Sequence, residues 1–153
     1  MDSLPQTLLA PALALVAWTL VMLVWLYATR IPAMTKLKID PQEAARTGKI
    51  PELPVTVTRV ADNYNHLHEQ PTLFYAVAII GHLALPENDV TGGAMAGDPI
   101  AFYAAWIFVA LRIVHSLIQA TVNLIMARFM VFLVSAAVLG VLLWRVAAAV
   151  FAS

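Results

Sequence analysis

Four long apolar runs are the feature of this sequence that most limits its fold. They cover residues 8–29, 71–85, 100–122 and 129–152. A helix that crosses the hydrocarbon core of a bilayer needs about 20 consecutive, mostly apolar residues. Three of the runs meet this requirement, and the run at 71–85 meets it only if the polar residues before it continue the same helix. The runs therefore predict membrane-spanning helices.

The composition agrees with a membrane protein. Of the 153 residues, 61% are hydrophobic and 12% are charged, whereas soluble domains are about 45–50% apolar and about 25% charged. The runs also lack the strict alternation of apolar and polar residues that is typical of membrane β-barrel strands. We therefore expect an all-α integral membrane protein, a single four-transmembrane-helix bundle domain spanning residues 1–153. Its helices are predicted at about residues 8–29, 59–85, 100–122 and 128–152.

Charge and cysteine content exclude several classes of function. Nine Lys and Arg residues balance nine Asp and Glu residues, so the net charge gives no reason to expect a nucleic-acid partner. The sequence contains no cysteine, which excludes disulfides, thiolate metal ligands and a thiol nucleophile of the protein itself. The first apolar run is too long, and the residues before it too poor in positive charge, for a cleaved signal peptide. We expect this run to be a retained span.

The connections between the runs predict the orientation in the membrane. Residues 30–59 contain six Lys and Arg residues, whereas residues 86–99 contain none and carry three acids. Because basic connections remain in the cytoplasm, we expect both termini outside. The lack of targeting signals, together with this topology, favours a bacterial inner membrane over an organelle. Arg145, near the outer end of the last run, is at odds with this orientation. Within the basic connection, Asp40 is expected to cap a short helical turn at 41–45.

The entrance to the second helix is unusually polar, reading RVADNYNHLHEQPTLFY over residues 59–75. Positions i, i+3, i+4 and i+7 share one helix face. That face holds Arg59, Asp62, Asn63, His66, Glu69 and Gln70. A helix that reaches about 30 Å must begin at residue 67 or earlier, so His66 and Glu69 would lie near the membrane interface, where charge needs partners. The alternative is that Arg59 pairs with Asp62 or Asn63 and the other groups are solvated.

The histidines also raise the possibility of a metal site. His66 and His68 are two residues apart and diverge on a helix, whereas His66 and Glu69 could bind one ion together. A carboxylate bundle site needs an equivalent pair on another helix, and His115 has no such partner. We therefore expect no metal. His82, alone in an apolar run, is expected to be a packing residue.

A second polar stripe lies on the third predicted helix, which reads AAWIFVALRIVHSLIQATVNLIMARFMVF over residues 104–132. The stripe consists of Arg112, His115, Gln119 and Asn123. Ionisable residues inside a membrane normally face the bundle interior or a water-filled cavity. A structural role, with Arg112 bonded to carbonyls or a glutamate of a neighbouring helix, is the alternative. Together with Arg59 and Arg128 at the same cytoplasmic end, the stripe predicts an anion-binding site.

These residues resemble a known family, the membrane-associated proteins in eicosanoid and glutathione metabolism (MAPEG). LRIVHS at 111–116, followed by RFMVF from Arg128, is similar to the family's Arg-x-x-His-(Thr/Ser) motif and the Arg that begins its fourth helix, with the spacing of the prostaglandin E synthase branch. Arg59 and Glu69 match the outer members of its pattern RxxRxxxNxxE. Asp62 stands in place of the second Arg, His66 in place of Asn, and Gln119 in place of a Tyr that contacts glutathione. A one-residue shift would instead place Asn65 on the Asn, at the expense of Arg59 and Glu69.

The resemblance implies a function and an assembly. Family members are trimers with the site between adjacent subunits, so we expect a homotrimer in the lipid bilayer, with glutathione as co-substrate and a lipophilic small-molecule substrate. By resemblance Arg128 is the catalytic residue that stabilises the glutathione thiolate. The residues expected to bind glutathione are Arg59, His66, Glu69, Arg112, His115 and Gln119.

The expected activity is that of a membrane-bound glutathione-dependent transferase or peroxidase acting on lipophilic electrophiles or lipid hydroperoxides. A free thiol has a pKa near about 8.5, and a nearby guanidinium lowers it by favouring the anion. The alternative is a non-catalytic lipid-binding or scaffold member of the same fold, favoured by the changes at Asp62, His66 and Gln119. A transporter is disfavoured because repeats and broken half-helices are not evident in the sequence.

Overall fold

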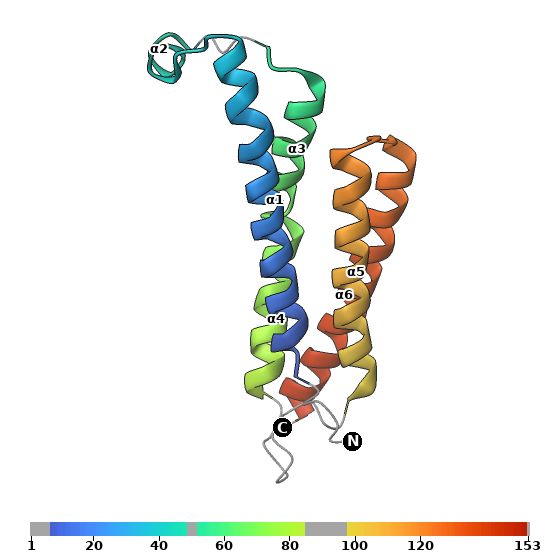
Figure 1. The fold of residues 1–153 in the computed structure, drawn as a ribbon. Coiled ribbons are helices and arrows are strands. Elements are labelled where there is room, and N and C mark those ends of the chain that lie inside the picture. Colours follow the sequence, from blue (N-terminus) through green and yellow to red (C-terminus); the bar gives the residue numbers. More distant parts are fainter. Residues whose placement is uncertain (1–6, 49–51, 85–97, 153) are drawn as a thin grey trace, which may run out of the picture.

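The computed structural model describes residues 7–48, 52–84 and 98–152, and all of the regular secondary structure in these ranges is helical. The helices are α1 (Leu9–Lys36), α2 (Pro41–Thr47), α3 (Val55–His66), α4 (Gln70–Ala84), α5 (Pro99–Ala120) and α6 (Ile125–Ala152). Figure 1 shows the long helices lying roughly parallel, with the beginning of α1 and the end of α6 at one end of the molecule and α2 at the other. The chain is therefore an elongated helical bundle.

Three of the helices, α1, α5 and α6, are long and apolar enough to cross a membrane. The 28 residues of α1 span about 42 Å at about 1.5 Å per residue, more than the hydrocarbon thickness of about 30 Å. Large apolar side chains such as Leu13, Val24 and Trp144 are exposed on α1 and α6. Apolar side chains on every face of a helix are typical of membrane spans, so these three helices agree with the prediction from the apolar runs.

The basic connection contains the short helix that the sequence predicts. The side chain of Asp40 accepts a hydrogen bond from the Gln42 N–H at 2.8 Å, and Pro41 occupies the first turn, where its missing N–H costs nothing. Gly48 ends the helix with a φ of +66°, a left-handed conformation that glycine adopts without strain. This helix, α2, runs to Thr47 and is slightly longer than the predicted turn.

The segment expected as one helix over residues 59–85 is instead divided into α3 and α4. The chain leaves the helical path at Leu67 and resumes it at Gln70, directly before Pro71. Proline lacks an N–H, and its ring clashes with the carbonyl four residues earlier, which here belongs to Leu67. The interruption places His66 at the last position of α3 and leaves Glu69 outside both helices.

The turn between α5 and α6 is tight and has a specific local conformation. Asn123 has a φ of +51°, a left-handed conformation that Asn tolerates better than most residues, and its N–H donates to the Ile118 carbonyl at 2.6 Å. The predicted third helix ends two residues earlier than expected, and α6 begins at Ile125 rather than near residue 128. Asn123 therefore lies in the turn, and Arg128 lies in the first turns of α6.

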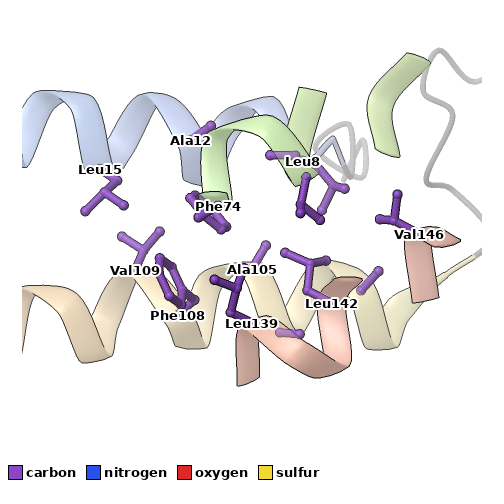
Figure 2. Packing of buried hydrophobic residues seen from close by; sticks show 14 residues of the cluster. Leu8, Ala12, Leu15, Phe74, Ala105, Phe108, Val109, Leu139, Leu142 and Val146 are labelled. Carbon is purple, nitrogen blue, oxygen red and sulfur yellow. The ribbon is translucent and has the colours of Figure 1, made fainter. Parts of the chain in front are cut away.

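The core is formed where α1, α4, α5 and α6 meet. Figure 2 shows Leu15 of α1 and Phe74 of α4 facing Phe108 of α5, with Leu142 of α6 beside them. The rings of Phe74 and Phe108 stack with centroids 4.6 Å apart. A second cluster joins α1, α3 and the end of α5 and consists of Met22, Leu26, Val60, Leu67 and Ala120. The two clusters hold the ends of α3, α5 and α6 in fixed relative positions.

An ion pair closes the end of the bundle opposite α2. Arg145 Nε lies 2.7 Å from Asp98 Oδ2, and Asp98 also caps α5 by accepting from the N–H groups of Ile100 and Ala101. Partial burial opposes ionisation of this carboxyl group, but the hydrogen bond from Arg145 and the two backbone donors outweigh it and hold the pKa of Asp98 below its ordinary value. The charge of Arg145, unexpected at this end, is thus neutralised.

Candidate functional site

A small cavity lies where the end of α3 meets α5 and the beginning of α6. Its volume is about 250 Å³, and it is lined by His66, His115, Ile125, Arg128, Phe129 and Phe132. Two imidazoles and a guanidinium thus share a space whose remaining walls are apolar. Three of the residues that the sequence singled out, His66, His115 and Arg128, come from three different helices and meet at this cavity.

Arg128 is held at the cavity by a residue of the preceding turn. Its Nη1 donates a hydrogen bond to Asn123 Oδ1 at 2.9 Å. A guanidinium has five N–H donors, and the bond to Asn123 is the only side-chain hydrogen bond made by Arg128 within the described ranges. Further donors therefore remain for a ligand in the cavity. Asn123, expected on the stripe of the third helix, serves to orient Arg128 instead.

Both ring nitrogens of His115 have partners within the protein. Nδ1 lies 3.1 Å from the backbone oxygen of Arg128, which can only accept, so Nδ1 carries a hydrogen. Nε2 lies 3.2 Å from the side-chain amide of Gln119, one helical turn away, and because Nε2 of the neutral ring accepts, this bond forms with the amide N–H turned toward the ring. His115 and Gln119 are both buried. The imidazole therefore joins α5 to the first turn of α6 and fixes the position of Arg128, while its ring face borders the cavity.

His66 is paired across the interruption between α3 and α4. Its Nδ1 lies 2.6 Å from Glu69 Oε2, and the side chains are 28% and 63% exposed, respectively. The ring packs beside the ring of His115, with centroids 5.3 Å apart, and stacks on Phe132 at 5.8 Å. Glu69 itself does not line the cavity, so it acts on the cavity through His66.

Arg112 is buried behind the cavity rather than exposed in it. Its guanidinium carbon lies 5.2 Å from the ring centre of Phe108 and 5.1 Å from that of Phe132, within the range of cation–π contacts. Among the described residues, Nε and Nη2 have no hydrogen-bond partner. Glu69 is the carboxylate that interacts electrostatically with it. Arg112 therefore supports Phe132, which forms a wall of the cavity.

Arg59 caps the end of α5. Its Nη1 donates to the Thr121 carbonyl at 3.0 Å, an oxygen left without an intrahelical donor at a helix C-terminus. This contact is with neither Asp62 nor Asn63, the partners that the alternative interpretation assigned. Of Arg59, Arg112 and Arg128, only Arg128 lines the cavity. Within one chain the three guanidinium groups do not surround a single anion.

The comparison with protein families bears directly on this site. The family model for MAPEG matches residues 8–148. The chain belongs to the MAPEG family. The match confirms the resemblance carried by LRIVHS and RFMVF, and together with the three long apolar helices it identifies an integral membrane protein. No curated protein and no solved structure matches the chain. Membership of MAPEG is consistent with glutathione-related transferase or peroxidase chemistry.

The three residues at which this MAPEG chain departs from the family pattern are Asp62, His66 and Gln119, and the structure shows what surrounds each of them. Gln119 is bonded to His115, and His66 is bonded to Glu69. Asp62 lies elsewhere, because it lines a separate cavity of about 300 Å³ together with Arg30 and Glu52. Two of the departures therefore lie at the cavity or one contact from it, while the third lies away from it.

Two aromatic residues of this MAPEG site were not predicted from the sequence. Phe129 and Phe132 line the cavity with Arg128, and their spacing from Arg128, at i+1 and i+4, places them on neighbouring faces of one helix.

Asn63, expected on the polar stripe of the second helix, is fully buried, and neither of its side-chain polar atoms has a partner in the described part of the chain.

Metal binding receives no support from the residues that the structure describes. They include no group of three or more His, Asp or Glu side chains arranged around a common point. His66 and Glu69 contact each other directly, and His115 uses both ring nitrogens in other bonds.

Proposed function

We propose that this MAPEG protein is a membrane-bound glutathione-dependent transferase or peroxidase that acts on lipophilic electrophiles or lipid hydroperoxides. The observation that carries the proposal is the position of Arg128, a guanidinium with free donors at an otherwise largely apolar cavity. A cation shielded from water favours the anionic form of a ligand there. The chain has no cysteine, so the thiol comes from the co-substrate.

In this proposal Arg128 is the catalytic residue, because it touches the thiolate of glutathione. His66 and His115 line the same cavity and border the thiol, while Glu69 and Gln119 orient the two imidazoles. Arg112 and Arg59 act on the bound co-substrate indirectly, since the first supports Phe132 and the second caps α5. The apolar walls, Phe129 and Phe132, contact the lipophilic substrate.

The size of the cavity supports a trimer. At about 250 Å³ it falls below the range of about 300–1,000 Å³ usual for pockets that enclose small organic ligands. One chain therefore encloses the thiol end of a tripeptide and leaves the charged ends outside. A homotrimer in which a neighbouring subunit covers the exposed side of the cavity would supply the remaining contacts, with glutathione between the two subunits.

The proposed topology has four crossings in one domain, with α3 and α4 together forming the second. The cavity lies at the same end of the bundle as α2 and the turn between α5 and α6, and this end carries the basic connection. The positive-inside rule then places the cavity toward the cytoplasm and both termini outside. A bacterial inner membrane is the bilayer that we propose.

The test is glutathione-dependent turnover by the purified protein. With glutathione present it is expected to conjugate a chlorodinitrobenzene-type electrophile or to reduce a lipid hydroperoxide, and Arg128→Ala is expected to lower kcat by about 100-fold, as when one charge-stabilising donor is removed. Arg46→Ala is the matched control, because Arg46 is exposed on α2 and should leave the rate unchanged. If the wild type shows no glutathione-dependent turnover and no binding of glutathione by calorimetry, the proposal is refuted.

The apolar walls of the cavity also favour a second candidate, a non-catalytic lipid-binding or scaffold protein. Ile125, Phe129 and Phe132 would then receive an acyl chain rather than a substrate. This candidate predicts a lipid that co-purifies with the protein and is retained by Arg128→Ala, and mass spectrometry of extracted lipid measures both. Glutathione-dependent turnover would count decisively against it.

A further inference from the structure

His66 has the arrangement of an oriented base. Its Nδ1 lies 2.6 Å from a carboxylate oxygen of Glu69, and a carboxylate accepts, so Nδ1 carries the hydrogen of the neutral ring. The second nitrogen, Nε2, is then left with a free lone pair. Within the described part of the chain Nε2 has no hydrogen-bond partner, and the residue lines the cavity that contains Arg128.

The ring of His66 is held in place from two further sides. It packs beside the His115 ring at 5.3 Å and on Phe132 at 5.8 Å between centroids. Glu69 is reached across the interruption between α3 and α4, which leaves the carboxylate 63% exposed and the imidazole 28% exposed. A base that is oriented by a third group and still open to a ligand has the arrangement used for activating a nucleophile.

The charged and titratable groups around His66 come from several elements. The nearest are Glu69 between α3 and α4, His115 and Arg112 on α5, and Arg128 on α6. On α1, the other helix packed against α3, the contacts are the apolar Met22 and Leu26, and Arg30 lines the separate cavity beside Asp62. Of the two imidazoles at the cavity, His66 alone keeps a ring nitrogen free, because both nitrogens of His115 are bonded within the described chain.

We propose that His66 is the proton acceptor for the thiol of the co-substrate and that Glu69 is its positioning residue. This inference rests on the proposed function. The S–H bond breaks as the proton moves to Nε2, which leaves a thiolate beside Arg128 and an imidazolium that Glu69 stabilises. The two residues have separate tasks, since Arg128 stabilises the anion and His66 removes the proton. An apolar cavity by itself would oppose ionisation of the thiol.

The proton is accounted for in both reactions. With a hydroperoxide, the S–O bond forms as the O–O bond breaks, and the proton on Nε2 passes to the leaving alkoxide, which gives an alcohol and the sulfenic acid of glutathione. A second glutathione thiol then converts the sulfenic acid to the disulfide and water. With an aryl halide, the C–S bond forms, halide leaves, and the proton passes to water.

The test compares His66→Asn with the wild type. Asn keeps polarity and similar length but cannot take a proton. Glutathione affinity, measured by calorimetry, is expected to change less than about 3-fold, because the Asn amide can replace the neutral hydrogen bond of the imidazole. At pH about 6.5–7 kcat/KM is expected to fall at least about 10-fold. This is a lower bound, because a general base usually contributes about 100-fold or more.

The pH profile separates a proton acceptor from a structural residue. The acceptor must be neutral, so wild-type kcat/KM is expected to show an acid limb, rising with pH and then levelling off. In His66→Asn that limb is expected to disappear, and the remaining rate should rise toward the titration range of a free thiol, about 8.5. Glu69→Gln removes the charge that stabilises the imidazolium, so its acid limb should move to lower pH.

His68→Asn is the matched control. His68 is exposed two residues along the chain, and its Nδ1 is bonded to the Tyr64 carbonyl at 2.9 Å, so this change should leave the rate and its pH profile unaltered. If the wild type binds and turns over glutathione while His66→Asn keeps the acid limb, or if His66→Asn abolishes binding, the assignment is overturned and the proposed function stands. If the wild type does not bind glutathione, both fall. Should His66→Asn not fold, the shift expected in Glu69→Gln decides the question.

Discussion

At the scale of single residues, the position of Arg128 depends on two neighbours that lie close to it in the sequence. Asn123 accepts from its guanidinium at 2.9 Å, and His115 contacts its backbone oxygen at 3.1 Å. Asn123 reaches Arg128 because the backbone takes a left-handed conformation there, with a φ of +51°. The turn between α5 and α6 is thus part of the site.

Replacing Asn123 by Gly tests this dependence. Glycine adopts the left-handed conformation without strain, so Asn123→Gly is expected to fold normally. It removes the acceptor that orients Arg128, and kcat/KM is expected to fall by about 10-fold, since hydrogen bonds to charged groups contribute about 1.5–3 kcal/mol. The measurement is the glutathione-dependent rate together with the thermal unfolding curve. A normal rate in a folded variant would show that Arg128 needs no such partner.

At the scale of helices, close packing of α4 against α1 and α6 depends on Gly81. A Cβ at this position would lie 2.8 Å from both Leu8 Cδ1 and Val146 Cγ2, shorter than real side chains tolerate. The same region contains buried Leu142 and Phe74.

Gly81→Ala is therefore expected to destabilise the bundle. Overpacking of a core costs about 1–3 kcal/mol, measured as a lower unfolding temperature in detergent. Val146→Ala makes room for the added methyl group. Gly81→Ala is therefore expected to lower the unfolding temperature less in the Val146→Ala background than in the wild type. Gly140→Ala is the control, because nothing lies within 4 Å of a Cβ at that position. An equal loss in both glycine variants would contradict the packing explanation.

The ion pair between Asp98 and Arg145 predicts a pH dependence of stability. The pKa of Asp98 is lowered in the folded protein, so its contribution is complete above the unfolded value of about 3.9 and is lost as the pH falls through the lower folded value. Asp98→Asn keeps a helix-capping side chain but removes the charge. It is expected to cost about 1 kcal/mol near pH 7, and the difference from the wild type should become smaller as the pH falls below about 3.9. Thermal unfolding of both proteins across this pH range measures the difference in stability. A difference that does not change with pH would contradict the explanation.

At the scale of the whole molecule, the sequence predicts the part of the structure that depends on local pattern. The apolar runs predict the helices α1, α5 and α6, because the requirement for length and apolarity is local. Asp40 predicts α2 for the same reason. Pro71 indicates that a helix can be interrupted here, but the length that a span of about 30 Å requires favoured one continuous helix. The exact ends of the helices depend on turns such as that at Asn123.

The sequence selected candidate residues from their spacing along single helices, but such spacing does not predict which of them meet across the bundle. Arg128, His115 and His66 line one cavity, although they come from three helices. The contact between Arg59 and the Thr121 carbonyl joins residues that are far apart in the sequence, and no periodicity predicts it. Arg112 was placed on the correct stripe, but its burial behind Phe132 depends on the packing of α5 against α6.

The central claim is that Arg128 stabilises a thiolate at the cavity. The most direct measurement is the ultraviolet absorbance of the thiolate when glutathione is added to the purified protein at about pH 7, where a free thiol with a pKa near about 8.5 is mostly protonated. We predict a stoichiometric thiolate signal with the wild type and with Arg46→Ala, and its loss with Arg128→Ala. A wild-type protein that binds glutathione without the signal, or an undiminished signal in Arg128→Ala, would contradict the claim.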